Sequence, residues 1–100
     1  MIDTQVTVTV VFKAKAGMQP RLKKTLAALI HPSRSDEDCI HYFMHQSLEE
    51  PSQFLLYMIW RTEAAFSRYI ATPQLQEFDD RLAHELLAEP YTLTRWRHLA

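Results

Sequence analysis

The sequence is short of several residue types, and each shortage excludes a class of protein. It has no asparagine, one glycine and one cysteine, and its formal net charge is −1. The single cysteine, Cys39, cannot form an internal disulfide, which is typical of a protein in a reducing compartment. One glycine is too few for a glycine-rich phosphate-binding loop. A net charge near zero provides no long-range field that would attract nucleic acid or an anionic membrane.

Long apolar segments are also absent. Residues 1–5 lack a positive segment followed by an apolar run, so we expect no signal peptide. No apolar run approaches the roughly 20 residues that span a bilayer. The length of 100 residues, with 47% hydrophobic and 23% charged residues, is typical of one globular domain over 1–100. We therefore predict a single soluble, cytoplasmic domain that binds neither nucleic acid nor membrane.

The spacing of apolar residues predicts four strands and three helices. Residues 5–13 alternate between two faces and are rich in valine and threonine, which is typical of a strand. Leucines at helical spacing predict a helix over Pro20–Pro32. Thr62 is expected to cap a short helix, and Thr72 a longer one that runs to about Leu87. The other strands are expected over Cys39–Ser47, Gln53–Arg61 and Tyr91–His98. The buried side chains of the last two helices are expected to be Phe66, Tyr69, Ile70, Leu75, Phe78, Leu82 and Leu86.

The order βαββααβ limits the topology. A short link between the second and third strands predicts an antiparallel hairpin. The natural closure is a ferredoxin-like α+β fold, with a four-stranded antiparallel sheet and the helices on one face. Within this sheet we expect the first and third strands to lie in the centre and to run parallel to each other.

The strands are apolar on both faces, although helices are expected on only one. The last strand adds Trp96 on the face opposite Leu93. A soluble monomer rarely exposes a large apolar patch, and the chain has no spare loop to cover the open face. We therefore expect a homodimer that covers it with a second copy. On the second strand the alternating sets are Ile40, Tyr42 and Met44 against His41, Phe43 and His45, and on the third Phe54, Leu56, Met58 and Trp60 against Leu55, Tyr57 and Ile59.

A series of short motifs resembles the antibiotic biosynthesis monooxygenase (ABM) superfamily along nearly the whole chain. This resemblance implies a dimeric α+β barrel. Some members oxidise polycyclic phenols or quinols with molecular oxygen and no metal or flavin, while others degrade haem or act on small signalling metabolites. The motifs are Pro32-Ser33-Arg34, Cys39-Ile40-x-Tyr42-x-x-His45-Gln46, Phe54-x-x-Tyr57-x-x-Trp60, Glu63-Ala64-x-Phe66 and Pro73-x-Leu75-x-x-Phe78.

The sequence departs from the family pattern at three points. Met58 stands where relatives commonly carry a glutamate, two residues before Trp60, and Tyr69 aligns with a common histidine. Several relatives use an asparagine in the pocket, and this chain has none. The asparagine–tryptophan–histidine set of haem-degrading members is therefore incomplete, which ranks haem binding or degradation below the other readings.

The candidate site is an apolar pocket between sheet and helices. The resemblance points to Trp60 and Tyr69 as catalytic residues, for a small aromatic or quinol-type substrate and with no cofactor. The alternative is that these residues only fill the core, where aromatic side chains are common. The substrate-binding candidates are Tyr42, Met44, Met58, Phe78, Leu82 and Arg34.

Catalysis by a cofactor-independent monooxygenase needs a base, because the ionised phenol is the form that passes an electron to oxygen. A tyrosine with the usual pKa of about 10 is a poor base at neutral pH. Two functions therefore stay open: a cofactor-independent phenol or quinol monooxygenase, and a non-catalytic ligand-binding or sensing dimer of the same fold.

The remaining charged residues indicate no further site. His41 and His45 lie four residues apart on a strand, about 13 Å, which is too far to share a metal ion. Asp79, Asp80 and Arg81 are adjacent and are expected to form a solvated face. We expect no metal site.

Overall fold

A computed structural model describes residues 4–100 of the chain. Residues 1–3, part of the segment in which we expect no signal peptide, lie outside the described residues. The order of elements is βαββααβ, as predicted, with the last helix divided into three parts. No helix within residues 4–100 is long and apolar enough to cross a membrane. The elements are β1 (Val6–Lys13), α1 (Gln19–Ser33), β2 (Cys39–Gln46), β3 (Gln53–Trp60), α2 (Glu63–Ile70), α3 (Pro73–Glu77), a π-helical turn (Phe78–Leu82), α4 (Ala83–Leu86) and β4 (Thr92–Arg97).

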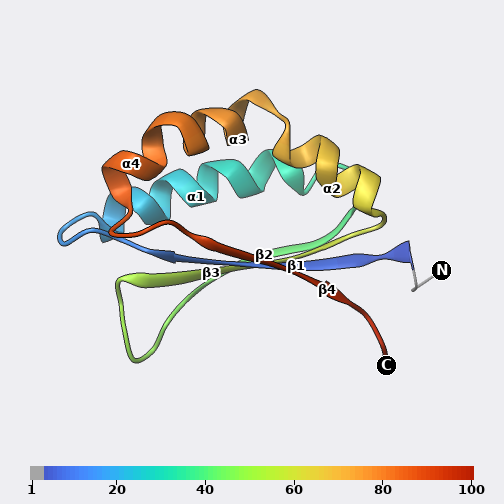
Figure 1. Ribbon diagram of the computed structural model, residues 1–100, viewed down its shortest axis with the longest axis horizontal. Coiled ribbons are helices and arrows are strands. Elements are labelled where there is room, and N and C mark those ends of the chain that lie inside the picture. The colour runs from blue at the N-terminus through green and yellow to red at the C-terminus, as the bar shows by residue number, and fades with distance from the viewer. Residues whose placement is uncertain (1–3) are drawn as a thin grey trace.

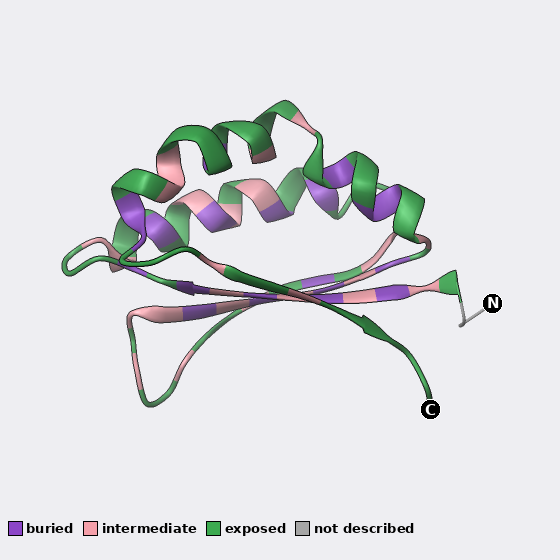
Figure 2. Cartoon of the chain, in the orientation of Figure 1, coloured by how far each residue is buried: buried purple, intermediate pink, exposed green. Residues whose placement is uncertain are grey.

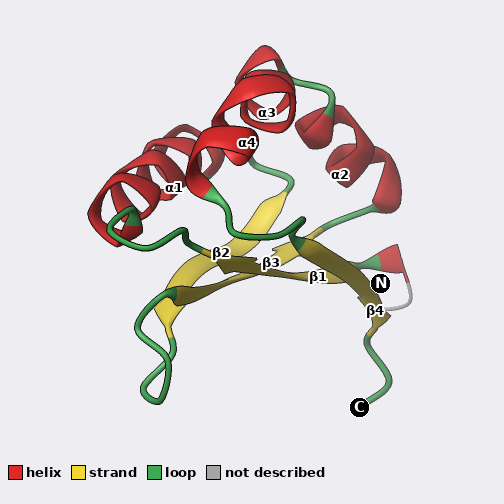
Figure 3. Ribbon diagram, turned by 60° about the vertical axis from the view of Figure 1, so that its left-hand side comes forward, coloured by secondary structure: helices red, strands yellow, loops and turns green. Residues whose placement is uncertain are grey.

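The strands form one antiparallel sheet in the order β2-β3-β1-β4, with all helices on one face (Figures 1 and 3). This confirms the ferredoxin-like α+β fold. The expectation that the first and third strands run parallel was wrong, because β1 and β3 pair antiparallel, with Val6 opposite Trp60. The reason is geometric. Helix α1 returns the chain to the end where β1 began, so β2 runs in the direction of β1, and the following hairpin reverses β3.

The helices begin where the sequence predicts. Gly17, with a φ of 81°, turns the chain before α1. Helix α1 ends one residue beyond Pro32, where the Ser33 hydroxyl donates a hydrogen bond of 2.8 Å to the carbonyl of Leu29. At the start of α2 the Thr62 hydroxyl accepts a bond of 3.1 Å from the Ala65 amide, so the expected cap forms.

A bulge changes the alternation at the start of β2. Cys39 pairs with Trp60 and Tyr42 with Met58, and the register shifts between them. Cys39 therefore packs against the core. The prediction that Ile40 shares a face with Tyr42 was wrong, because Ile40 is the extra residue of the bulge. The bulge leaves Tyr42 directed toward the helices, where it is 2% exposed.

The core lies between the sheet and the helices, where buried residues follow one face of the strands (Figure 2). Leu22 and Leu26 from α1 are fully buried there. Phe66 of α2 is buried as predicted, but Ile70 is 39% exposed because it lies at the end of that helix, at the edge of the helical layer. The expected long final helix is interrupted by the π-helical turn, a feature often found at functional sites.

The opposite face of the sheet is open and apolar. Tyr57 is half-buried at its centre, between Thr9 of β1 and Phe43 of β2. Phe43 is 46% exposed and Trp96 54%. The Trp96 indole donates a 2.9 Å hydrogen bond to the hydroxyl of Thr9. The helices of residues 4–100 all lie on the other side of the sheet in Figure 1.

Two leucines test where the stability of this fold resides. Leu26→Ala should lower the free energy of unfolding by about 2–5 kcal/mol, because it leaves a cavity in the core. Leu48→Ala is the matched control, since Leu48 is 95% exposed between β2 and β3 and its change should stay within about 0.5 kcal/mol. Urea unfolding followed by circular dichroism, at one protein concentration, measures both. If both variants lost the same free energy of unfolding, the assignment of Leu26 to the core would be contradicted.

Candidate functional site

A cavity of about 350 Å³ lies between the sheet and the helices. It crosses the sheet from Tyr42 on β2 to Leu93 on β4. Its volume falls in the range of small-molecule sites, and its walls are mainly apolar, as in such sites. The side chains that form the walls include Val10, Phe12, Leu56, Met58, Phe66, Leu75 and Phe78.

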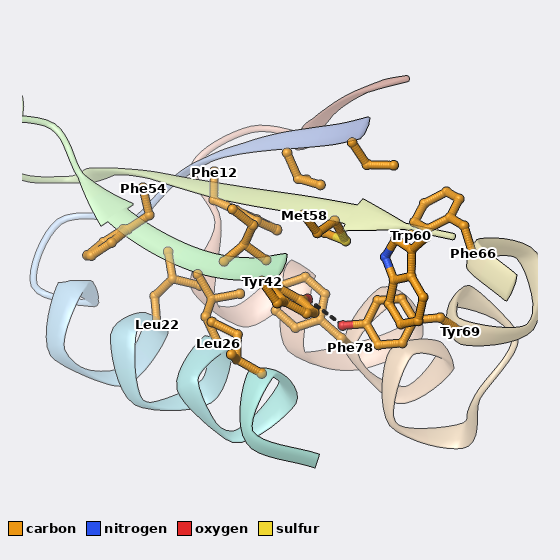
Figure 4. Packing of buried hydrophobic residues seen from close by; sticks show 14 of the residues in the cluster. Phe12, Leu22, Leu26, Tyr42, Phe54, Met58, Trp60, Phe66, Tyr69 and Phe78 are labelled. Carbon is orange, nitrogen blue, oxygen red and sulfur yellow. Dashed lines mark hydrogen bonds between the residues drawn. The ribbon is translucent and has the colours of Figure 1, made fainter. Parts of the chain in front are cut away.

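Two tyrosine hydroxyls form the polar group at the β2 end of the cavity. Tyr42 from β2 and Tyr69 from α2 share a hydrogen bond, drawn as a dashed line in Figure 4. Their rings meet edge to face at 5.7 Å. Two hydroxyls carry two protons and their mutual bond uses one, so the second O–H can donate to the Ser33 oxygen, whose own proton goes to Leu29, or to a ligand.

Burial keeps both hydroxyls protonated. It is the main cause that raises the pKa of Tyr42, and the neighbouring Tyr69 raises it further. Burial also raises the pKa of Tyr69, although hydrogen bonds with Tyr42 and Ser33 act in the opposite direction. The pair can therefore donate a hydrogen bond at neutral pH but cannot serve as a base.

Trp60 packs against Tyr69 of this pair. Its indole is fully buried and stacks on the ring of Tyr69, with centroids 4.8 Å apart (Figure 4). Its Nε1–H has no hydrogen-bond partner among residues 4–100. An unpaired buried donor costs on the order of 1–3 kcal/mol. Trp60 lines a neighbouring cavity of about 210 Å³, and Tyr69 and Leu75 belong to the walls of both.

The structure brings some of the candidate site residues together and leaves others apart. Tyr42, Met58, Tyr69 and Phe78 line the larger cavity, and Trp60 lines only the smaller one. The other three candidates do not reach the larger cavity. Met44 and Leu82 are partly buried and pack against the core instead.

Arg34 lies outside both cavities. Its Nε and Nη2 donate to the backbone carbonyl of Tyr42 at 3.0 and 2.8 Å, and its guanidinium carbon lies 5.5 Å from the centre of the Phe43 ring. Because β2 is an edge strand, this carbonyl has no neighbouring strand to pair with on that side. The predicted substrate-binding residue thus contacts the sheet edge and not the pocket.

A second polar group, which the sequence did not predict, lies at the β4 end of the larger cavity. The Tyr91 hydroxyl donates a 2.6 Å hydrogen bond to Oδ1 of Asp79, and both side chains line the larger cavity. Burial and this bond raise the pKa of Tyr91 to about 12. Asp79 is exposed, as the sequence predicts for a solvated face, and it also lines the cavity. It lies in the π-helical turn, next to the buried Phe78, and the only sequence signal was an acidic residue beside a predicted core aromatic.

The cavities offer few ligands for a metal or a haem. No histidine lines either of them, so they provide no imidazole for a haem iron. Within residues 4–100 no group of three or more histidine, cysteine, aspartate or glutamate side chains lies close enough to hold a metal ion. His41 stacks on Phe43 with ring centroids 5.7 Å apart, on the open face of the sheet.

Known proteins resemble this chain in sequence and in fold. The family model described as antibiotic biosynthesis monooxygenase matches residues 5–81. An uncharacterized protein of Synechocystis is 33% identical over 85 residues, or 81% of this chain, and the chain spans 57% of that relative's length. A crystal structure from Shewanella oneidensis is 26% identical with a TM-score of 0.90, and one from Pseudomonas aeruginosa is 28% identical with a TM-score of 0.89. The first match covers 94% of this chain and 90% of the other, and the second 100% and 99%.

The buried tyrosine pair should make stability fall at alkaline pH. Burial raises the folded-state pKa of both hydroxyls, so the unfolded chain releases these protons first, above about pH 10. The free energy of unfolding should keep this contribution below that pH and lose it above. We expect a smaller alkaline loss in the double variant Tyr42→Phe/Tyr69→Phe, measured by urea unfolding from pH 8 to about pH 11.

Leu48→Ala is the control for this measurement, because Leu48 lies at an exposed loop position and does not titrate. It should reproduce the alkaline slope of the wild type. A double variant with the wild-type slope would show that the pair ionises equally well in the folded and unfolded chain, against the prediction.

Proposed function

The chain belongs to the antibiotic biosynthesis monooxygenase family, and we propose that it oxygenates a neutral phenol or quinol in the cavity between its sheet and its helices. The observation that carries this proposal is the form of the cavity. It is apolar and ends at two buried, hydrogen-bonded tyrosines, of which Tyr69 stacks against Trp60. The family description supports the monooxygenase class, and the cavity chemistry supports an aromatic, hydroxylated substrate.

The proposed reaction needs no electrons beyond those of the substrate. A phenol with a hydrogen on the ring carbon opposite its hydroxyl loses four electrons when it becomes a quinone. One atom of O₂ enters the ring as the new carbonyl, and the other leaves as water with the two hydrogens that the phenol gives up. The anion reacts first, because loss of the phenolic proton makes the ring electron-rich enough to reduce oxygen.

Tyr42 and Tyr69 would stabilise this anion. Their raised pKa values keep both hydroxyls protonated, so the pair presents a fixed donor to the substrate oxygen on which negative charge develops. The apolar walls strengthen that bond because they exclude water. Trp60 would hold the ring of Tyr69 in place by stacking. In this proposal the protein orients the substrate and stabilises charge, and the oxygen chemistry belongs to the substrate.

A second candidate is ligand binding without catalysis. The same pKa shifts favour it, because neither tyrosine can take a proton from the substrate at neutral pH. Met58, which lines the cavity, also stands where relatives commonly carry a glutamate. Turnover distinguishes the two candidates, since both predict that a phenol binds.

We further propose that the chain acts as a homodimer whose two copies meet through the open face of the sheet. Members of this family are typically dimeric. The face carries Phe43, Tyr57 and Trp96, and a second sheet packed on it would remove this apolar surface from water.

Oxygen uptake tests the enzymatic proposal. An oxygen electrode should record consumption with some member of a panel of naphthols, polycyclic phenols and reduced naphthoquinols. Tyr69→Phe should lower kcat about 100-fold, because it removes a donor to the developing charge. Trp60→Phe should also lower it, with Trp96→Phe on the open face as the matched control. Substrate binding without oxygen uptake across the panel would leave the non-catalytic candidate.

Mass measured by light scattering tests the dimer. The measured mass of the wild type should be twice that of one chain. Tyr57→Glu should have the mass of a monomer, because the substitution would place two carboxylates between the sheets. Leu48→Glu, at an exposed loop position, should remain dimeric. A monomeric wild type at micromolar concentration would exclude this interface.

A further inference from the structure

The β4 end of the larger cavity is built by two elements that are distant in sequence. Asp79 comes from the π-helical turn, and Tyr91 from the segment just before β4. The ring of Tyr91 packs against Phe12 and Phe78, with centroids 5.3 and 6.3 Å away. These contacts hold the ring in place, and its hydroxyl donates a hydrogen bond to Oδ1 of Asp79. The carboxylate is therefore held at the cavity wall.

Asp79 forms no ion pair among residues 4–100, and it is exposed to solvent at the rim of the cavity. Arg81, two residues further along, pairs with Glu77 and Glu85 instead. Within the part of the chain that the structure describes, no lysine, arginine or histidine forms an ion pair with Asp79, and none lines the cavity. The carboxylate is therefore the one charged group in the cavity wall, and its second oxygen can accept a hydrogen bond.

The two ends of the cavity thus have opposite hydrogen-bonding character. At the β2 end Tyr42 and Tyr69 offer an O–H donor, and at the β4 end Asp79 offers a charged acceptor. The space between them crosses the strands β3 and β1 and is apolar, with Met58 and Val10 in its wall. A ligand that satisfies both ends needs an acceptor oxygen at one end, an aromatic body, and a donor at the other.

We propose that Asp79, positioned by Tyr91, makes this cavity select aromatic substrates with hydroxyl groups at opposite ends and exclude those with a carboxylate at the β4 end. The inference rests on the proposed use of this cavity as a substrate site and names the substrate class more closely. A neutral hydroxyl donates to the carboxylate, whereas an anionic group is repelled in a site with no compensating cation.

Anaerobic binding measures this selection without turnover. The probes are 2,6-dihydroxynaphthalene, 2-naphthol, which lacks the second hydroxyl, and 6-hydroxy-2-naphthoate, in which a carboxylate replaces it. Isothermal titration calorimetry under nitrogen at pH 7 should give the wild type a Kd for the dihydroxy probe about tenfold lower than that for 2-naphthol. The naphthoate should bind more weakly than both.

Three variants separate charge, position and fold. In Asp79→Asn the preference for the dihydroxy probe should shrink, and the naphthoate should gain about tenfold in affinity, since the repelling charge is gone. Asp80→Asn makes the same change one residue away, outside the cavity wall, and should bind all three probes like the wild type. Tyr91→Phe keeps the charge but releases the carboxylate, so it should weaken the dihydroxy preference while the naphthoate stays excluded.

The outcomes distinguish this inference from the proposed function. Equal affinities of wild type and Asp79→Asn for the naphthoate would overturn it, even if the protein consumes oxygen with naphthols. The expected selectivity in a protein that consumes no oxygen would support it and leave the non-catalytic candidate. A change of the same size in Asp80→Asn would also overturn it, because the effect would then come from the general charge of the helix and not from the cavity wall.

Discussion

The structure depends on one constraint, the two-residue alternation of side chains along the central strands. In β3 every second residue lies under the helices, and the residues between them lie on the open face. A shift of one residue in the pairing with β1 would exchange the two sets. It would move Met58 and Trp60 out of the core and bring Tyr57 into it. Because both sets are apolar, burial alone does not choose between them. The packing of the side chains against the helices selects the observed register, because it allows Trp60 to stack on Tyr69.

The same alternation produces the cavity. Helices cover one face of the sheet, and the space between them and the sheet can enclose a small molecule within a single chain. Its walls are apolar, and its polar groups lie at the ends, where Tyr42 reaches from the edge strand β2 and Asp79 from the π-helical turn. Water is poorly accommodated between such walls. The buried hydroxyls of Tyr42 and Tyr69 therefore have a stronger influence on a ligand than they would at the surface, whereas Asp79 acts from the exposed rim.

The family likeness and the site chemistry agree only in part. The fold and most of the chain match the family, yet no histidine and no glutamate among residues 4–100 line the larger cavity. Its β2 end can donate hydrogen bonds but cannot accept a proton at neutral pH. Such a site suits a substrate that ionises readily by itself, or a ligand that is only bound. The carboxylate of the larger cavity, Asp79, lies at its other end.

The sequence by itself determined the elements, the faces of the strands and the convergence of Tyr42, Met58 and Tyr69 under the helices, because alternation and helical spacing are local properties. Tertiary structure decided what depends on direction and on irregular backbone. Pairing between strands set the direction of β3 and the bulge near Ile40. It also left the Tyr42 carbonyl at the edge of β2 free to accept hydrogen bonds from Arg34. The place of Asp79 in the cavity wall follows from the π-helical turn and from Tyr91, which lies 12 residues further along and meets it only in the folded chain.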